Sequence, residues 1–240
     1  MNKNLLYILL LTYIFSSCEL INYERVKGNG NPGSEQRNIG RATRIKSLGS
    51  FDVKLIQGNT TGVKIEADAN LIPYIVTEEE DGYLVVKTKD HVNLTSTNPI
   101  RVYITTDKLE ELEVAGSSDI TGEGKFAGAD HLKLSIAGSG NITLDVNTPE
   151  IDASIAGSGD INLTGETKDA KVEIAGDGNY KAENLKSENV AVSIAGSGDV
   201  RVFADNTLKV DIAGSGDIYY KGNATITKSI AGSGTIKPLP

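Results

Sequence analysis

Apolar and polar residues alternate along most of the chain after residue 18. In an extended strand, such alternation places every second side chain on the same face, so that one face is buried and the other meets water. Ile and Val, which are enriched in strands, hold many of the apolar positions. Clear examples are residues 132–136, 142–146, 190–194 and 208–212. Since no stretch of this part carries convincing helical periodicity, the pattern predicts an all-β protein.

A seven-residue phrase, Ile-Ala-Gly-Ser-Gly-Asp-Ile, links these alternating segments. It stands unchanged at residues 155–161 and 212–218, and near copies begin at residues 114, 136, 174, 194 and 230. The steps between successive copies are 22, 19, 19, 20, 18 and 18 residues. A period of about twenty residues is typical of stacked repeats. Because one turn of each repeat is constant and the other varies, the pattern favours a β-helix with coils of about 18–22 residues over an antiparallel meander.

The phrase itself is predicted to be a corner of the scaffold. Its two apolar residues lie six positions apart and point inward, while Ala, Ser and the closing Asp or Asn point outward. Glycine suits a crowded or left-handed bend, and Asp or Asn can bond to nearby backbone groups. Alternation of Asn with Asp limits charge repulsion along the stack. We therefore predict a structural turn column, which comprises Gly138, Gly140, Asn141, Gly157, Gly159, Asp160, Gly176, Gly178, Asn179, Gly196, Gly198, Asp199, Gly214, Gly216, Asp217, Gly232 and Gly234.

The region before the first copy also alternates. Residues 51–56, 63–67, 83–87 and 100–104 are predicted strands, and residues 71–79 and 107–112 are predicted connectors. The simplest arrangement continues the helix into larger, less regular first coils. At the other end, Pro238 and Pro240 would blunt the last open edge, because proline donates no backbone hydrogen bond.

The first 18 residues are typical of an export signal. Lys3 precedes an apolar run over residues 5–15, which is too short to span a bilayer as a helix. Ser16, Ser17 and Cys18, the only cysteine, follow this run and resemble the lipobox of bacterial lipoproteins. We predict a lipoprotein signal peptide over residues 1–18 with a lipidated Cys18, a flexible Gly- and Asn-rich tether over residues 19–40, and one β-helix domain over residues 41–240.

The repeats, together with four further segments, resemble the head GIN domain family. These segments are residues 37–39 (Arg-Asn-Ile), 51–58 (Phe-Asp-Val-Lys-Leu-Ile-Gln-Gly), 81–84 (Asp-Gly-Tyr-Leu) and 216–222 (Gly-Asp-Ile-Tyr-Tyr-Lys-Gly). The resemblance covers about residues 36–237 and implies a right-handed parallel β-helix, an adhesin label and an origin in Bacteroidetes lipoproteins. It implies no established catalytic residues. A left-handed β-helix is the alternative, because Ile212, Ile218, Ala224, Ile230 and Ile236 lie six residues apart.

Charge and composition limit the kinds of ligand that the chain is expected to bind. The net charge is −8, and −9 without the residues before Cys18, so nucleic acid is not an expected partner. A calcium β-roll would need two Asp-bearing turns per coil and an uninterrupted set of oxygen ligands, whereas each coil here has one such turn. His91 and His131 are expected to be surface residues. The sequence therefore predicts neither a metal site nor a cofactor.

The expected function is non-enzymatic. We expect an outer-membrane lipoprotein of the cell envelope, facing the periplasm or the surface, that acts in surface interaction or adhesion. Its expected partners are the membrane, through the lipid anchor, and a glycan or protein ligand. The alternative is a protein that binds or cleaves polysaccharides, for which the acidic candidates are Glu66, Asp68 and residues 78–81, and the outward-facing aromatic residue is Tyr219.

Overall fold

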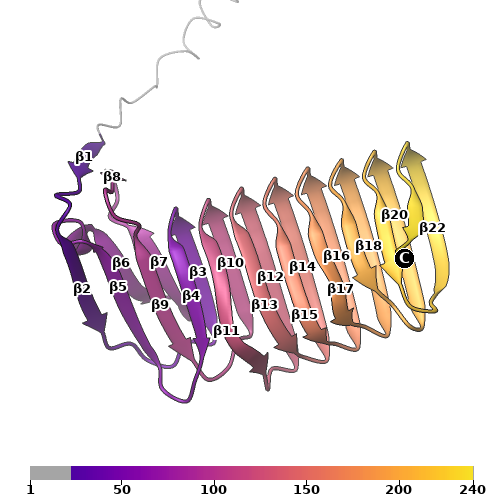
Figure 1. The fold of residues 1–240 in the computed structure, drawn as a ribbon, viewed down its shortest axis with the longest axis horizontal. Helices are drawn as coiled ribbons and strands as arrows, with labels where there is room; N and C mark the ends of the chain where they lie inside the picture. The colour runs from indigo at the N-terminus through magenta and orange to yellow at the C-terminus, as the bar shows by residue number, and fades with distance from the viewer. Residues whose placement is uncertain (1–22, 240) are drawn as a thin grey trace, which may run out of the picture.

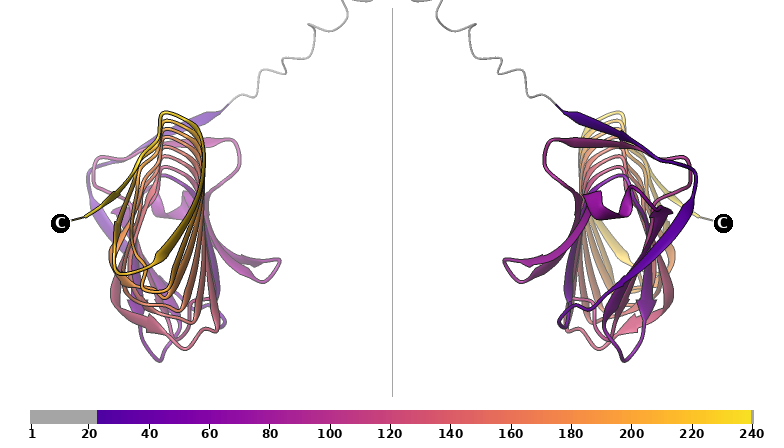
Figure 2. Two further views of the ribbon diagram at one scale, coloured as in Figure 1. Left: turned by 90° about the vertical axis from the view of Figure 1, so that its right-hand side faces the viewer. Right: turned by 90° about the vertical axis from the view of Figure 1, so that its left-hand side faces the viewer.

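The computed structural model describes residues 23–239, which form a β-solenoid. The chain winds repeatedly through two facing sheets that stack their strands along one long axis (Figure 1), and the end-on views show a flattened closed loop (Figure 2). The only helix among these residues is the 3₁₀ helix η1 (Ile72–Tyr74). The predicted all-β solenoid is confirmed, while its right-handed sense and the left-handed alternative stay predictions. Cys18 and the rest of the predicted signal peptide lie outside the described residues.

One long side of the loop is a ten-stranded sheet. Its strands, in spatial order, are β22 (Thr225–Gly232), β20 (Thr207–Gly214), β18 (Asn189–Gly196), β16 (Asp169–Gly176), β14 (Glu150–Gly157), β12 (His131–Gly138), β10 (Glu111–Gly116), β3 (Arg44–Gly49), β7 (Tyr83–Thr88) and β6 (Ile75–Glu80). All neighbours pair in parallel except β6 and β7.

The other long side is an eleven-stranded sheet. Its strands are β2 (Pro32–Arg37), β5 (Gly62–Asp68), β9 (Arg101–Thr106), β4 (Asp52–Gln57), β11 (Asp119–Ala127), β13 (Asn141–Asn147), β15 (Ile161–Glu166), β17 (Tyr180–Lys186), β19 (Val200–Phe203), β21 (Ile218–Lys221) and β23 (Ile236–Pro238). Here β5 pairs antiparallel with both β2 and β9. A separate pair joins β1 (Glu24–Lys27) to β8 (Val92–Thr95).

Each regular coil takes one strand from each sheet. In one of them, β14 runs into the Gly-Ser-Gly corner and β15 leads out of it. Equivalent residues of neighbouring coils are strand partners, so that Ile136, Ile155 and Ile174 stack in one buried column. The core consists of such columns from both sheets and fills the space between them. In each regular coil, the apolar residues of the alternating pattern therefore face the core, and the polar residues face the solvent.

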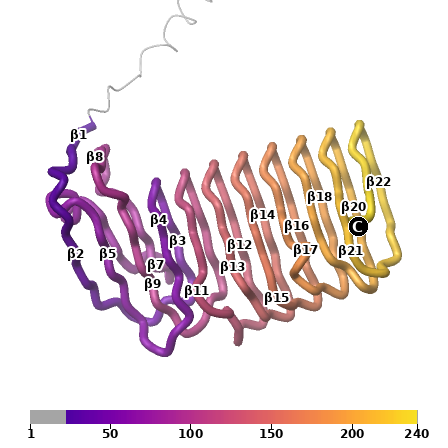
Figure 3. Tube along the Cα trace, viewed as in Figure 1, coloured from indigo at the N-terminus to yellow at the C-terminus, as the bar shows by residue number. Residues whose placement is uncertain are grey.

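The first coils are threaded out of chain order. Strands β3 and β4 lie between the layer of β7 and β9 and the layer of β10 and β11, although β7 and β9 come later in the chain (Figure 3). The less regular start was predicted, but this insertion was not. It is accommodated because Gly49 pairs with Gly116 and Asp52 pairs with Asp119, so that β3 and β4 form a corner in register with the repeats.

The structure differs from the predicted tether over residues 24–37, which form β1 and β2. The glycines of this segment allow its backbone to lie close to neighbouring residues. A Cβ on Gly28 would overlap the carboxylate of Asp68, and one on Gly33 would press on Ala69. By pairing with β5, strand β2 covers an edge that would otherwise be open at this end of the solenoid.

The C-terminal end has no such cover among the described residues. The last coil consists of β22 and β23, and its core positions Ile226, Ile230 and Ile236 are half-buried. Lys228 stands at an inward position of this coil and is exposed. The final strand ends at Pro238.

Candidate functional site

The repeated phrase lies at the corner between the two sheets. Gly157 has a φ angle of 131°, which disfavours any residue with a side chain. A Cβ at this position would also overlap the carbonyl oxygen of Gly138 in the neighbouring coil. The second glycine, Gly159, faces the carbonyl oxygen of Gly140 and the side chain of Ile136. These corners are packed too closely for larger residues.

The polar residue that closes each phrase binds the next coil. Oδ1 of Asn141 accepts a hydrogen bond from the backbone amide of Asp160 at 3.1 Å, and Oδ1 of Asp160 accepts one from the amide of Asn179 at 3.1 Å. The same contact recurs from the amide of Asp199 to Asn179, from Asp217 to Asp199 and from Thr235 to Asp217. One oxygen of each acceptor is therefore used in holding the stack together.

These contacts also shift the pKa of two members. Burial raises the pKa of Asp160, but hydrogen bonds from Lys181, whose Nζ lies 2.6 Å from Oδ2, and from Asn179 outweigh it and lower the pKa. Hydrogen bonds from Thr235 lower the pKa of Asp217. Both side chains are therefore stabilised as carboxylates by hydrogen bonds within the protein. This agrees with a structural role for the column.

One departure from the phrase has a local explanation. Ser118 replaces the second glycine of the first copy. The neighbouring coil holds Ser47 where other coils hold a larger apolar residue, and its hydroxyl donates to the hydroxyl of Ser118 at 2.8 Å. The hydroxyl of Ser118 also accepts the amide of Phe51 at 3.1 Å and donates to the carbonyl of Gly49 at 3.2 Å. Residues 47–53 therefore form a further copy of the phrase. It was not recognised in the sequence because Ser47 and Phe51 replace the usual apolar residue and glycine.

A shallow groove of about 650 Å³ runs along the outer face of the ten-stranded sheet, beside the corner. Strands β12 to β22 contribute equivalent residues to it, so the groove crosses coil after coil without interruption. One row of its lining is Ala137, Ala156, Ala175, Ala195, Ala213 and Ala231. The next row is Ser135, Ser154, Glu173, Ser193, Asp211 and Ser229. The small side chains of the alanine row leave this part of the face hollow.

Opposite charges alternate along another column of the same face. Its members are Arg44, Glu111, Lys133, Asp152 and Lys171. Glu111 is the most buried carboxylate of the column: Arg44 lies 3.0 Å and Lys133 lies 2.8 Å from its oxygens, and the hydroxyl of Tyr83 donates to it at 2.7 Å. Burial raises the pKa of Glu111, but the hydrogen bonds from Lys133, Tyr83 and Arg44 outweigh it and lower the pKa to about 2.

All but one of the acidic candidates of the glycan-cleaving alternative make structural contacts; the exception is Asp81, an exposed turn residue. Asp68 is fully buried, and its carboxylate accepts the backbone amide of Thr97 at 2.7 Å. Glu66 pairs with Lys64 at 2.6 Å. In the segment over residues 78–81, Glu78 and Glu80 pair with one lysine, Lys87, and the side chain of Glu79 accepts the amide of Gly40.

The aromatic candidate, Tyr219, does not form part of an exposed aromatic platform. Tyr219 is half-buried, and its hydroxyl donates to Asp217 at 3.3 Å. Tyr220 is also half-buried, and Tyr180 lies fully in the core. Among the described residues, the only large apolar or aromatic side chain with high exposure is Tyr23, which lies beside His91.

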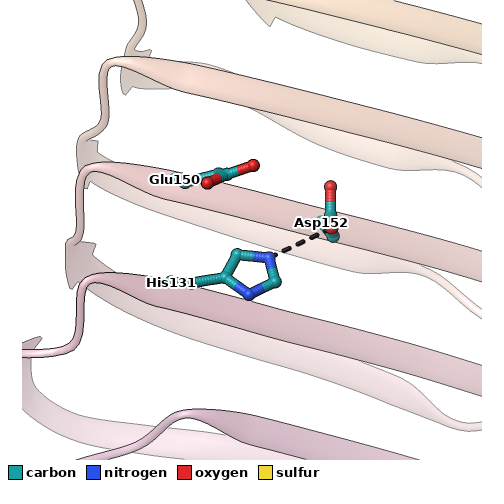
Figure 4. A group of neighbouring side chains, drawn as sticks. All are labelled: His131, Glu150 and Asp152. Atoms are coloured by element: carbon teal, nitrogen blue, oxygen red, sulfur yellow. Dashed lines mark hydrogen bonds and ion pairs between the residues drawn. The ribbon is translucent and has the colours of Figure 1, made fainter.

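The structure brings His131 together with two carboxylates that sequence reasoning did not connect to it. Nε2 of His131 lies 3.0 Å from Oδ2 of Asp152, and one ligand atom from each of His131, Glu150 and Asp152 lies within 4.8 Å of the others (Figure 4). His131 and Glu150 are strand partners 19 residues apart. That spacing equals the step between two copies of the phrase, which is the signal that could have revealed the pair.

Comparison with known proteins identifies the family. The sequence profile described as "Putative auto-transporter adhesin, head GIN domain" matches residues 42–224, which is more than half of the chain. The chain belongs to the head GIN domain family. In the fold, this GIN match runs from β3 to β21 and leaves out β1, β2, β22 and β23. None of the curated proteins compared with the chain matches it.

Several solved structures similar to this GIN domain come from Bacteroidetes. One, described as a putative lipid binding protein from Parabacteroides distasonis, is 30% identical with a TM-score of 0.77, and the match covers 90% of this chain and 100% of that one. A putative adhesin from Parabacteroides merdae is 25% identical with a TM-score of 0.71, over 90% and 100%. A putative adhesin from Bacteroides fragilis, 23% identical with a TM-score of 0.83 over 89% and 100%, shows the shared fold.

The described part of the GIN domain contains no helix of the length and apolar character that a membrane crossing requires.

Proposed function

We propose that this chain is a lipid-anchored, non-enzymatic protein of the cell envelope that binds an extended ligand at the cell surface. The family and the similar structures, several of which are described as putative adhesins, support a role in surface interaction. The apolar run and Cys18 at the start of the chain support export and lipid anchoring, with the outer membrane as the site of attachment.

The observation that carries the proposal is the groove on the ten-stranded sheet. It presents the same alanine methyl group from six successive coils, from Ala137 to Ala231, at a repeat of roughly 4.8 Å. A polymer lying along this groove would make one weak contact per coil, and many weak contacts in series give useful avidity. The candidate ligands are a cell-surface glycan and an extended protein segment.

The electrostatics favour binding over cleavage. Glycoside hydrolysis needs a carboxylic acid whose pKa is raised, so that it can protonate the leaving oxygen. Within residues 23–239, every carboxyl group with a shifted pKa has it lowered by hydrogen bonds or cations; these groups are Glu66, Asp68, Asp107, Glu110, Glu111, Asp160 and Asp217. For Glu66 and Asp68, two acidic candidates of the glycan-cleaving alternative, these shifts favour the ionised form over the protonated form that a general acid requires.

A binding screen tests the groove. The purified wild-type chain is applied to a glycan array and to whole cells, beside the variants Ala175→Arg and Thr143→Arg. Ala175 is an exposed residue in the middle of the groove, and Thr143 is an exposed residue on the eleven-stranded sheet. We expect Ala175→Arg to weaken binding at least tenfold and Thr143→Arg to bind like wild type. Equal binding by all three chains, or binding of wild type to neither target, contradicts the proposal.

The anchor is tested separately by cell fractionation. Replacing Cys18 by Ala removes the only thiol that could carry a lipid, so the variant should leave the membrane fraction. Replacing the adjacent Ser17 by Ala keeps that thiol and serves as the control. If Cys18→Ala stays with the membranes to the same extent as wild type, lipid anchoring is wrong.

A further inference from the structure

Three side chains with metal-ligand chemistry meet where β12 and β14 begin. His131 and Glu150 are strand partners at the first position of each strand. Asp152 stands two residues after Glu150, so both carboxylates project from the same outer face of β14. Figure 4 shows the imidazole and both carboxylates on this face. Because β12 and β14 also pair with β10 and β16, their backbones are held from both sides.

The spacing of the donor atoms suits a shared cation. Two ligands bound tetrahedrally to one Zn²⁺ at about 2.0–2.1 Å lie roughly 3.3–3.4 Å apart. Nε2 of His131 and Oδ2 of Asp152 are 3.0 Å apart, so a small rotation of either exposed side chain would give them this spacing. The Glu150 carboxylate lies within 4.8 Å of both atoms and is exposed, so rotation of its side chain can bring it to the same point.

The local charges favour a cation as well. Asp152 is flanked along its column by Lys133 and Lys171, but the ammonium groups of these lysines bond to Glu111 and Glu173, each at 2.8 Å. In the described part of the chain, the only ion pair of Asp152 is with His131, and Glu150 has none within 4.0 Å. Lys171 offsets part of the charge of Asp152, but neither carboxylate has an ion pair with a lysine of the described residues, and a divalent cation between them would relieve their remaining repulsion.

The geometry points to a divalent-cation site formed by His131, Glu150 and Asp152 that takes Zn²⁺. One imidazole nitrogen and two carboxylate oxygens are typical ligands of Zn²⁺. Ca²⁺ fits poorly, because it requires six to eight oxygen ligands. Three protein ligands on an open face leave a coordination position for water or for a donor atom of a partner molecule. The site lies at one side of a second, smaller groove of about 350 Å³ over β14 to β20, to which Glu150 and Asp152 contribute.

Zinc titration of the purified full chain in detergent tests the site, with isothermal calorimetry for stoichiometry and affinity. We expect one Zn²⁺ per chain, and at least tenfold weaker binding in each of His131→Ala, Glu150→Gln and Asp152→Asn. The matched controls are His91→Ala, which removes the other histidine, and Asp211→Asn, which removes a carboxylate on β20 of the same sheet. Both controls should bind Zn²⁺ like wild type. Circular dichroism verifies that each variant is folded.

Three results overturn the inference. The first is the absence of saturable Zn²⁺ binding by the folded wild-type chain, in which case His131 and Asp152 form only a surface ion pair. The second is wild-type affinity in folded His131→Ala. A Ca²⁺ competition adds a further check: equimolar Ca²⁺ should leave the bound Zn²⁺ in place, and its displacement would show a carboxylate site without histidine ligation.

Discussion

The residue that fits at each corner position depends on the side chains and backbone of the neighbouring coil. Gly140 and Gly159 face a carbonyl oxygen and a branched side chain of the neighbouring coil, so no side chain fits there. Ser118 stands at the equivalent place in its coil and is accommodated because Ser47 is small and offers a hydroxyl partner. The substitution tolerated at this corner is therefore conditional on a residue one coil away in space, although Ser47 and Ser118 are 71 residues apart in sequence.

A corner glycine should be far less replaceable than the serine next to it. Gly157→Ala places a side chain at a φ of 131° and against the carbonyl oxygen of Gly138. We expect a loss of at least about 2 kcal/mol from the backbone conformation alone, seen as a lower urea midpoint. The control is Ser158→Ala at an exposed position, which should change stability by less than about 0.5 kcal/mol. Equal midpoints for the two variants would contradict the account of the corner.

At the scale of elements, side-chain columns link neighbouring strands. Strands β3, β10 and β12 are joined by Glu111, which accepts from Arg44 on one side and from Lys133 on the other. The Cζ atom of Arg44 lies 3.8 Å from the centroid of the Tyr83 ring. Since Tyr83 belongs to β7, this contact brings a fourth strand into the network. This network lies where the irregular first coils meet the regular repeats.

The network around Glu111 should make the stability of the folded chain depend on pH. The pKa of Glu111 is about 2 in the folded chain and ordinarily 4.5. As the pH falls, the unfolded chain therefore takes up the proton first, so the stabilisation is present above about pH 4.5 and is lost towards pH 2. Glu111→Gln should cost roughly 1–3 kcal/mol at pH 7 and should reduce the loss of stability between pH 4.5 and 2.

Urea midpoints at pH 7 and pH 3 measure this effect. The control is Glu173→Gln, whose exposed pair with Lys171 should contribute less than about 1 kcal/mol. If Glu111→Gln loses stability with acid as steeply as wild type, Glu111 is not the group that gives the folded chain its acid sensitivity.

At the scale of the whole molecule, the two ends of the solenoid differ. The N-terminal end is covered by antiparallel strands, and the guanidinium of Arg37 donates to the carbonyl oxygens of Ile72 and Ile75 there. The C-terminal end leaves half-buried isoleucines on β22 and β23, with Lys228 exposed among the inward positions. A charged residue at such a position and Pro238 in the last strand both oppose pairing with another chain.

Much of this architecture could be predicted because its causes are local and repeated. The parity of Ile155 and Ile161 correctly placed both in the core, and Ala156 and Ser158 outside. The coil of β3 and β4 was missed because Ser47 and Phe51 interrupt the phrase. The paired strands over residues 24–37 were missed because glycines required for close packing have the same composition as a flexible linker.

By itself, the sequence determined the solenoid, the length of its coils and the inside and outside of each strand, because alternation and glycine bends act over a few residues. Only the tertiary structure decided what the coils place side by side. The threading of β3 and β4 and the network that joins Glu111 to Arg44 and Tyr83 depend on register between strands that are distant in the chain. That register is set by the lengths of the return loops and by core packing, neither of which can be read from one segment alone.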